Sequence, residues 1–388
     1  MKGGVLAMEG YINVHCHLLN FRFIPDAFFR VRAPIRERML RHRLTWGLAR
    51  FICAIWPGRK YDKIHEALAM MDKDIDIVAD GLLSEMQEAG IVMVTPLMMD
   101  LEFASFNVKP ETPYRYQVLL VSEIAGKRPG EIMPFIMFDP RRKGVSELIK
   151  RALEEMGFLG VKMYPPLGYH PDPCSFLNDA EMNRELKEVY AYCEKESIPV
   201  TTHCSRGGAY SGDLMRCKEL VLQFCQPSSW EGVLKKYPGL YLNFGHFGGG
   251  EDFLDIKNPK SWSYTIRDFM GQYDHVYGDI SYHDPALWSE TSGDYFDALN
   301  DLMKDSVVKD RIIFGTDWLM TRHTWKEKEY VDAYRRLPPE SLQQIACDNP
   351  LDFLFPGKRI PPRIKYFFRS RNIEERKLPE WMRNRLQF

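Results

Sequence analysis

Eight short apolar segments recur along the chain, and their alternation with helical segments constrains the fold more than any other feature. Each segment is rich in Val, Ile, Phe and Tyr and is bounded by Gly or Pro, which predicts a buried β-strand. They cover residues 11–15, 90–98, 132–138, 157–164, 198–204, 240–246, 275–281 and 311–317. Apolar residues with helical spacing fill the intervals, for example at 63–89, 144–156, 179–196 and 285–304.

Strands that alternate with helices pair in parallel through βαβ units. Eight such units in one chain predict an α/β fold of the (β/α)8 type, a TIM barrel. An open, doubly wound sheet is the alternative. Its dinucleotide and phosphate fingerprints, GxGxxG and GxxxxGK[ST], are absent from the sequence.

Two segments fall outside the eight units. We therefore expect a barrel over residues 1–356, with an insertion at 20–60 after the first strand, and a C-terminal extension at 357–388. The insertion carries eight arginines and two acidic residues between positions 22 and 50, and the extension carries ten Lys and Arg against three Glu. Such basic segments are typical of solvated decoration or of a subunit interface. Because the insertion follows a strand end directly, it is also a candidate cap over the active site.

The composition excludes several kinds of partner. A net charge of -1 gives no indication of nucleic-acid binding. The apolar stretch at 44–57 is too short to span a bilayer and contains Arg50, so we expect no membrane span. The first ten residues lack the pattern of a signal peptide, and the eight cysteines form no CxxC pair. These features favour a reduced, cytoplasmic protein.

Metal-competent side chains gather at the predicted C-terminal ends of the strands, where TIM barrels carry their active sites. His15 and His17 end the first strand, and the alternation of a strand directs both toward one point. The other candidates are Lys162 in the fourth strand, His203 in the fifth, His246 in the sixth and Asp317 in the eighth. Imidazole and carboxylate groups together hold a borderline cation such as zinc while leaving a position for water.

These residues, in this order, match a known family. The segments that carry the match are "VHCH", "GVKMYPP", "VTTHCS", "NFGHFGG", "IIFGTDW" and "IACDNPLDFLF". Over about residues 10–356 the chain resembles the amidohydrolase superfamily of metal-dependent hydrolases, and most of all its amidohydrolase 2 branch. That branch includes decarboxylases, lactonases and hydratases.

The resemblance implies a site with one or two divalent ions, zinc by preference, with manganese also allowed. His15, His17, His203 and Asp317 would bind the primary metal, and Asp317 would also take the proton of the activated water. His246 would be a ligand of a second metal or a catalytic histidine that polarises or protonates the substrate.

Lys162 has three interpretations. It matches the position at which binuclear members carry a carbamylated lysine that bridges two metals. A plain ammonium group has only donors and cannot bind a metal, so this role requires the carbamate. Alternatively, the lysine stays cationic and binds a substrate carboxylate, or it pairs with a carboxylate at a strand end.

Two further residues are candidates for substrate binding. Tyr164 follows the fourth strand in a loop that its prolines make rigid. Arg206 follows the fifth strand, and its planar guanidinium suits a substrate carboxylate or phosphate, although a structural ion pair is the alternative.

From these residues we expect a metal-dependent hydrolase that acts on an ester, lactone or amide of a small carboxylated or ring-bearing molecule. A metal-dependent decarboxylase is the alternative, since the same ligands serve both reactions and the fold does not fix the reaction. The expected partner is a small-molecule substrate. A homodimer is expected only because symmetric dimers are common.

Overall fold

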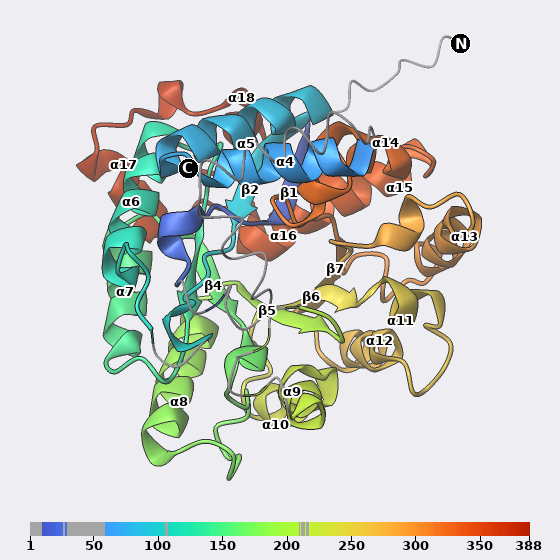
Figure 1. Cartoon of the computed structure of the whole chain (residues 1–388), viewed down its shortest axis with the longest axis horizontal. Helices are drawn as coiled ribbons and strands as arrows, with labels where there is room; N and C mark the ends of the chain where they lie inside the picture. Colours follow the sequence, from blue (N-terminus) through green and yellow to red (C-terminus); the bar gives the residue numbers. More distant parts are fainter. Residues whose placement is uncertain are drawn as a thin grey trace.

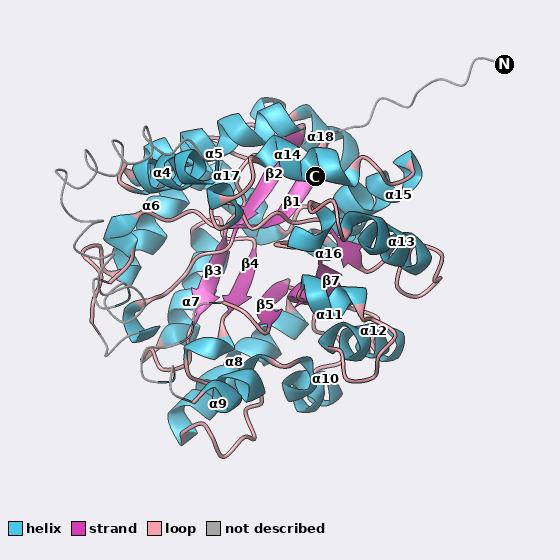
Figure 2. Ribbon diagram, turned by 45° about the vertical axis from the view of Figure 1, so that its right-hand side comes forward, coloured by secondary structure: helices cyan, strands magenta, loops and turns pink. Residues whose placement is uncertain are grey.

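All eight expected strands are present in the computed structural model, which describes residues 10–25, 28, 59–104, 108–208, 210, 214 and 217–388. The strands are β1 (Tyr11–Cys16), β2 (Ile91–Pro96), β3 (Phe135–Phe138), β4 (Gly160–Met163), β5 (Val200–Ser205), β6 (Leu242–Gly248), β7 (Val276–Asp279) and β8 (Ile312–Ile313). They lie together in the centre of the molecule, with helices around them (Figure 2).

The strands form one closed, parallel barrel in sequence order. Strands β1 and β2 pair with each other, and β3 to β8 pair consecutively, every pair being parallel. Strand β2 meets β3 where the Met98 amide donates to the Phe135 carbonyl over 3.0 Å. The circle closes between β8 and β1, where the Val14 amide donates to the Phe314 carbonyl over 3.0 Å. The predicted (β/α)8 TIM barrel is therefore confirmed.

The helices cover the outside of this barrel (Figure 1). They are α4 (Arg59–Met71), α5 (Ile75–Ala89), α6 (Tyr114–Lys127), α7 (Val145–Glu155), α8 (Ala180–Lys195), α9 (Lys218–Cys225), α10 (Glu231–Lys236), α11 (Gly250–Leu254), α12 (Trp262–Gln272), α13 (Ser292–Leu302), α14 (Glu327–Tyr334), α15 (Pro339–Gln343), α16 (Asn349–Leu354), α17 (Pro362–Ser370) and α18 (Glu380–Arg385).

Two of the predicted helical segments have different bounds in the structure. Residues 63–89 belong to two helices, α4 and α5, because Asp74 is extended and begins a new helix, with Asp76 in its first turn. Acidic residues are favourable at a helix N-terminus. The segment 285–304 contains one helix that begins only at Ser292, since Pro285 lies in a separate 3-10 turn.

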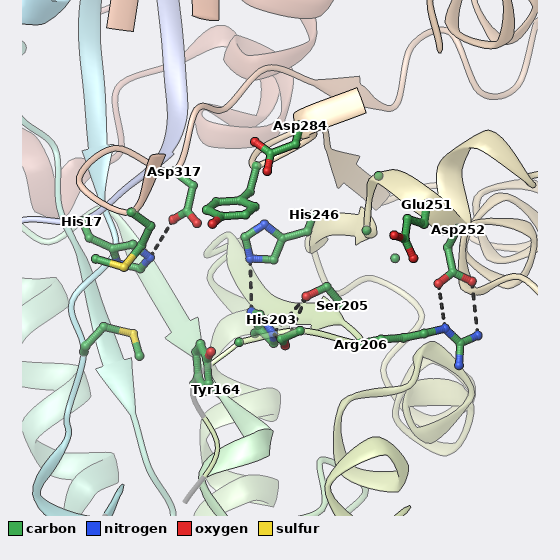
Figure 3. Close-up of a pocket in the computed structure, with 18 of the residues that line it drawn as sticks. His17, Tyr164, His203, Ser205, Arg206, His246, Glu251, Asp252, Asp284 and Asp317 are labelled. Carbon is green, nitrogen blue, oxygen red and sulfur yellow. Dashed lines mark hydrogen bonds and ion pairs between the residues drawn. The ribbon is translucent and has the colours of Figure 1, made fainter. Parts of the chain in front are cut away.

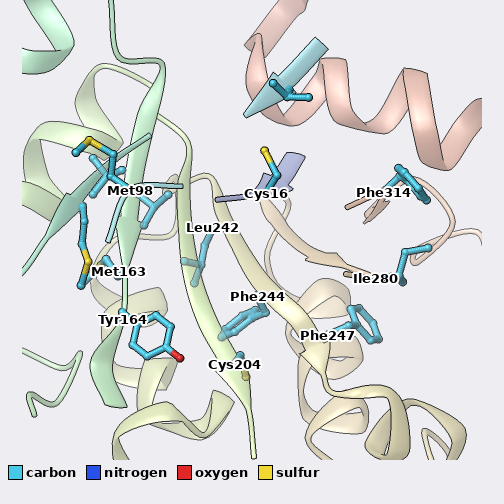
Figure 4. Packing of buried hydrophobic residues seen from close by; sticks show 14 of the residues in the cluster. Cys16, Met98, Met163, Tyr164, Cys204, Leu242, Phe244, Phe247, Ile280 and Phe314 are labelled. Atoms are coloured by element: carbon cyan, nitrogen blue, oxygen red, sulfur yellow. The ribbon is translucent and has the colours of Figure 1, made fainter. Parts of the chain in front are cut away.

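Apolar side chains from the strands and the surrounding helices form the main core. Figure 4 shows Cys16, Cys204, Phe244 and Phe314 among its members, all buried. No disulfide bond joins the cysteines in the described part of the chain.

The C-terminal extension packs against the end of the barrel opposite the candidate site. Its helices α17 and α18 bury Phe367 and Met382 in a second apolar cluster, together with residues of β1, β2 and β3. The Arg363 guanidinium donates to the carbonyls of Phe158 and Leu159, both over 2.6 Å, just before β4. Although this segment is basic in composition, its apolar side chains are buried and cover the bottom of the barrel.

Most of the predicted insertion at 20–60 lies outside the described residues, and so does its suggested role as a cap. Within the described ranges, no helix is both long enough and apolar enough to cross a membrane.

Candidate metal centre

His15 and His17 meet Asp317 where β1 adjoins the chain after β8. The two chain segments are held together here, because the Asp317 amide donates to the His15 carbonyl over 2.7 Å. Asp317 Oδ1 lies 3.0 Å from His17 Nε2 and 3.7 Å from His15 Nε2. One ligand atom from each of the three residues fits within 4.8 Å of the others, and all three side chains are buried. The structure therefore brings these three predicted ligands together.

The free atoms of this cluster fit a bound cation. His17 Nδ1 donates to the Leu97 carbonyl over 2.8 Å, so that its Nε2 presents a lone pair toward Asp317. Among the described residues, His15 Nε2 and Asp317 Oδ1 have no hydrogen-bond partner, although both are buried. Burial lowers the pKa of His15 to about 4, which keeps its ring neutral. Buried polar atoms are normally paired, and a divalent ion would satisfy these.

His203 and His246 form a second pair at the ends of β5 and β6 (Figure 3). His203 Nδ1 lies 3.1 Å from His246 Nε2. The outer nitrogens face carbonyls, His203 Nε2 at 3.0 Å from Gly207 and His246 Nδ1 at 3.2 Å from Ser281. Because a carbonyl can only accept, each neutral ring can donate its single proton on the outer side.

The two inner nitrogens, His203 Nδ1 and His246 Nε2, face each other within hydrogen-bond distance. Burial is the main reason that the pKa of both His203 and His246 is lowered, so an additional proton is disfavoured there. A metal ion would fill this position, and the pair is suited to bind one. His203 is not within the group formed by His15, His17 and Asp317.

Lys162 is fully buried in β4, and its Nζ has no hydrogen-bond partner among the residues described. Burial lowers the pKa of Lys162 to about 8, and its positive charge contributes to the low pKa values of His15, His203 and His246. Lys162 makes no hydrogen bond to a strand-end carboxylate among the described residues, although the charges of Asp279 and Asp317 partly offset the effect of burial on its pKa. The amine is therefore available for modification or for a ligand.

The backbone is strained where these side chains enter the site. His246, Phe247, Tyr282 and Asp317 all have a positive φ, between 42° and 66°. Residues other than glycine rarely adopt this left-handed conformation, and each instance costs about 1–3 kcal/mol. Such strain concentrates at functional sites because the surrounding structure must impose it.

Beside the two histidine groups lies a cavity of about 810 Å³. Its apolar wall consists of Leu19, Ile24, Phe28, Met71, Met99, Leu101 and Met320, three of which precede or lie in the predicted insertion. Tyr164 lines the cavity and stacks on His203, with 4.4 Å between the ring centroids. The acidic side chains of Glu251 and Asp284 also line the cavity (Figure 3). A cavity of this size suits a small organic molecule.

Arg206 also lines the cavity, but it is committed to a structural ion pair. Its Nε and Nη2 donate to the Asp252 carboxylate over 2.7 and 3.2 Å, and its guanidinium lies 4.7 Å above the Trp262 ring. The structure thus shows the structural ion pair that the sequence offered as the alternative for Arg206. A role for Arg206 in substrate binding stays a prediction.

The sequence reasoning missed Asp279, the last residue of β7, and Ser281, two residues further on. Asp279 Oδ2 lies 2.9 Å from His15 Nδ1, and Ser281 Oγ lies 3.0 Å from both His15 Nδ1 and His246 Nδ1. The sequence contains a signal for both, because the segment "HVYGDIS" places an acidic residue and a serine at the end of the seventh strand. His283 also reaches the site, with its Nε2 2.8 Å from the His246 carbonyl.

A closed (β/α)8 barrel with buried histidines and a carboxylate at its C-terminal end defines a class of TIM-barrel enzymes that use metal ions. The family comparison makes the assignment definite. Residues 12–355 match the amidohydrolase family, and the chain belongs to it.

Solved structures with the same fold include enzymes of different activities. A 5-carboxyvanillate decarboxylase from Novosphingobium aromaticivorans, complexed with manganese, is 12% identical, with a TM-score of 0.54 over 89% of this chain and 96% of that chain. A probable 2-pyrone-4,6-dicarboxylic acid hydrolase from Acinetobacter baumannii is 12% identical, with a TM-score of 0.51 over 89% and 99%. An amidohydrolase from Burkholderia multivorans with bound zinc is 11% identical, with a TM-score of 0.53 over 89% and 98%.

Proposed function

We propose that this protein is a metal-dependent hydrolase that acts on an ester, lactone or amide of a small ring-bearing molecule. The observation that carries the proposal is the buried Lys162 amine, which lacks a partner in the described structure while its charge acts on both histidine groups. A pKa of about 8 leaves part of the amine neutral near physiological pH. A neutral amine can combine with carbon dioxide and release one proton, which gives an anionic carbamate.

In this proposal the two groups of side chains hold two divalent ions. His15, His17 and Asp317 would hold the first, and His203 and His246 would hold the second, with the Lys162 carbamate as a ligand of both. Histidine-rich donor sets favour zinc, and manganese is the alternative. Ions bound there would supply Lewis acidity, which lowers the pKa of water and polarises a substrate oxygen.

Asp317 is the proposed general base. Burial alone would raise the pKa of Asp317, but His17, His15 and His246 together outweigh this effect and lower it, so the carboxylate is ionised. An ionised carboxylate at the cavity can accept the proton of an attacking water. Tyr164 and the apolar wall would hold the ring of the substrate and exclude water from it. Arg206 would contact the substrate at the edge of the cavity.

Decarboxylation of an aromatic carboxylic acid is the second candidate. It is supported by the similarity in fold to the 5-carboxyvanillate decarboxylase and by an apolar wall that suits an aromatic ring. In that case Lys162 would stay cationic and bind the substrate carboxylate, and one metal ion would be enough.

The test is a comparison of matched substrates with zinc- and manganese-loaded protein. Aryl esters and lactones should release acid, measured by pH-stat titration, whereas hydroxybenzoates should release no carbon dioxide. Asp317→Asn should abolish turnover while the circular dichroism spectrum is unchanged, and the exposed Asp294→Asn should leave turnover intact. Carbon dioxide release without acid release would favour the decarboxylase, and full activity of Asp317→Asn would refute the proposed base.

A further inference from the structure

Asp279 is a buried carboxylate that the proposed chemistry does not use. It ends β7 and is fully buried. Its Oδ2 lies 2.9 Å from His15 Nδ1 and accepts from Asn243 Nδ2 over 2.7 Å. Its Oδ1 accepts from the backbone amides of His246 and Ser281 over 3.0 and 3.2 Å, and from the Ser281 hydroxyl. These contacts therefore connect Asp279 with His15 and His246 of the proposed metal centre, and with Asn243 and Ser281 beside them.

The charge of Asp279 fixes the protonation pattern of His15. Hydrogen-bond donors surround the Asp279 carboxylate: the Asn243 amide group, the backbone amides of His246 and Ser281, and the Ser281 hydroxyl. The carboxylate is therefore ionised and can only accept hydrogen bonds. His15 must then carry its single proton on Nδ1, which leaves the lone pair of Nε2 directed toward Asp317.

The same carboxylate supports the second histidine group through the backbone. His246 has a φ of 66°, in the left-handed region that costs about 1–3 kcal/mol for a residue with a side chain. The hydrogen bond from the His246 amide to Asp279 Oδ1 stabilises this turn at the point where the imidazole enters the site. One oxygen of Asp279 thus orients a ring of the first group, and the other oxygen orients a residue of the second.

We propose that Asp279 is a positioning residue that sets the Nδ1–H tautomer of His15 and fixes both proposed metal subsites relative to each other. A carboxylate behind a metal-binding histidine holds the ring in place and raises its basicity, and its loss typically weakens metal binding by about 10- to 100-fold. The inference rests on the proposed function only in taking His15 and His246 as ligands.

The experiment compares the full chain with its Asp279→Asn and Asp294→Asn variants. The Asn variant keeps the shape of the side chain but removes its charge and lets an amide face His15, so the Nε2–H tautomer becomes favourable. The Asp294→Asn variant is the matched control, since it makes the same chemical change at an exposed position on α13, away from the metal centre. Circular dichroism verifies that each variant is folded.

Two readouts decide the matter. Nitrogen-15 NMR of the metal-free protein, labelled at histidine, reports the tautomer of His15 without any need for activity. Competition with a chromogenic chelator reports zinc affinity. We expect the Nδ1–H tautomer in the wild type, its loss in Asp279→Asn, and a fall in zinc affinity of about 10- to 100-fold. Asp294→Asn should keep the tautomer and change affinity by less than about threefold, well below that range.

Some outcomes would overturn the inference. An Nε2–H tautomer in the wild type would refute it even if Asp279→Asn does not fold. An unchanged tautomer and zinc affinity in a folded Asp279→Asn protein would refute it as well. A wild type that binds no zinc would instead overturn the proposed function, while the tautomer measurement would still decide what Asp279 does to His15.

Discussion

Glu327 should make the stability of this protein fall as the pH rises through the neutral range. It is the first residue of α14, it is 2% exposed, and it lies behind the metal centre. Its Oε1 accepts from Asn13 Nδ2 over 3.3 Å, and Asn13 Oδ1 in turn accepts from the His15 amide over 3.1 Å. Burial raises the pKa of Glu327 from 4.5 to about 8, with smaller contributions from the charges of Glu85 and Asp317.

The sign and size of the effect follow from proton linkage. Between pH 4.5 and about 8 the folded state keeps the proton of Glu327, whereas the unfolded state has released it. Folding therefore takes up a proton, and stability decreases with rising pH by about 1.4 kcal/mol per unit. From pH 5.5 to 7.5 the wild type should lose roughly 2.5 kcal/mol relative to a variant that cannot ionise here.

Urea denaturation at several pH values measures this difference. Glu327→Gln keeps the size of the side chain and its neutral form, so its free energy of unfolding should approach or exceed that of the wild type as the pH rises. Glu340→Gln, on the exposed surface of α15, is the control and should follow the wild type throughout. Parallel curves for the wild type and Glu327→Gln would show that Glu327 ionises normally in the folded state and would refute the reasoning.

Two further substitutions, each with a control, test the packing of the C-terminal extension and the packing around His15. Phe367→Ala, at a side chain 1% exposed in the extension, should cost about 3–5 kcal/mol of unfolding free energy, whereas Tyr366→Ala, 58% exposed, should cost less than about 0.5 kcal/mol. Similar thermal melts of the two variants would mean that the extension is not part of the core. Gly315→Ala would place a Cβ 2.7 Å from the His15 Cβ, so zinc affinity should fall at least about tenfold, while Gly293→Ala, with open space around it, should bind zinc as the wild type does. Equal affinities would contradict the crowding at His15.

The fold was predictable because the strands of a TIM barrel are buried on both faces and appear as separate apolar segments. Each of the eight segments overlaps an observed strand, and β1, β5 and β6 run one or two residues beyond the predicted segment. The pairing of His15 with His17 and their meeting with Asp317 also followed from sequence, because parallel strands bring their C-terminal ends to one side. These inferences needed only the order of the strands.

Other features depend on contacts that no local pattern reveals. The ion pair of Arg206 joins it to Asp252, which lies 46 positions later on α11. The role of Asp279 becomes evident only in the folded barrel, where β7 pairs with β6 and Asp279 contacts His15. In the extension, the number of basic residues obscured the periodic apolar positions that cover the bottom of the barrel. The sequence contains these residues, but only the tertiary structure assigns their partners.

The metal content of the purified protein tests the central claim most directly. Elemental analysis of protein prepared without chelator should find about two equivalents of divalent metal per chain. Lys162→Ala should reduce this to one or none, and Lys187→Ala, on the exposed face of α8, should not change it. If the wild type and Lys162→Ala both contain one equivalent of metal, the result would contradict a pair of metal ions bridged by Lys162 and would support the decarboxylase. No metal in the wild type, even after addition of zinc or manganese, would contradict the metal centre itself.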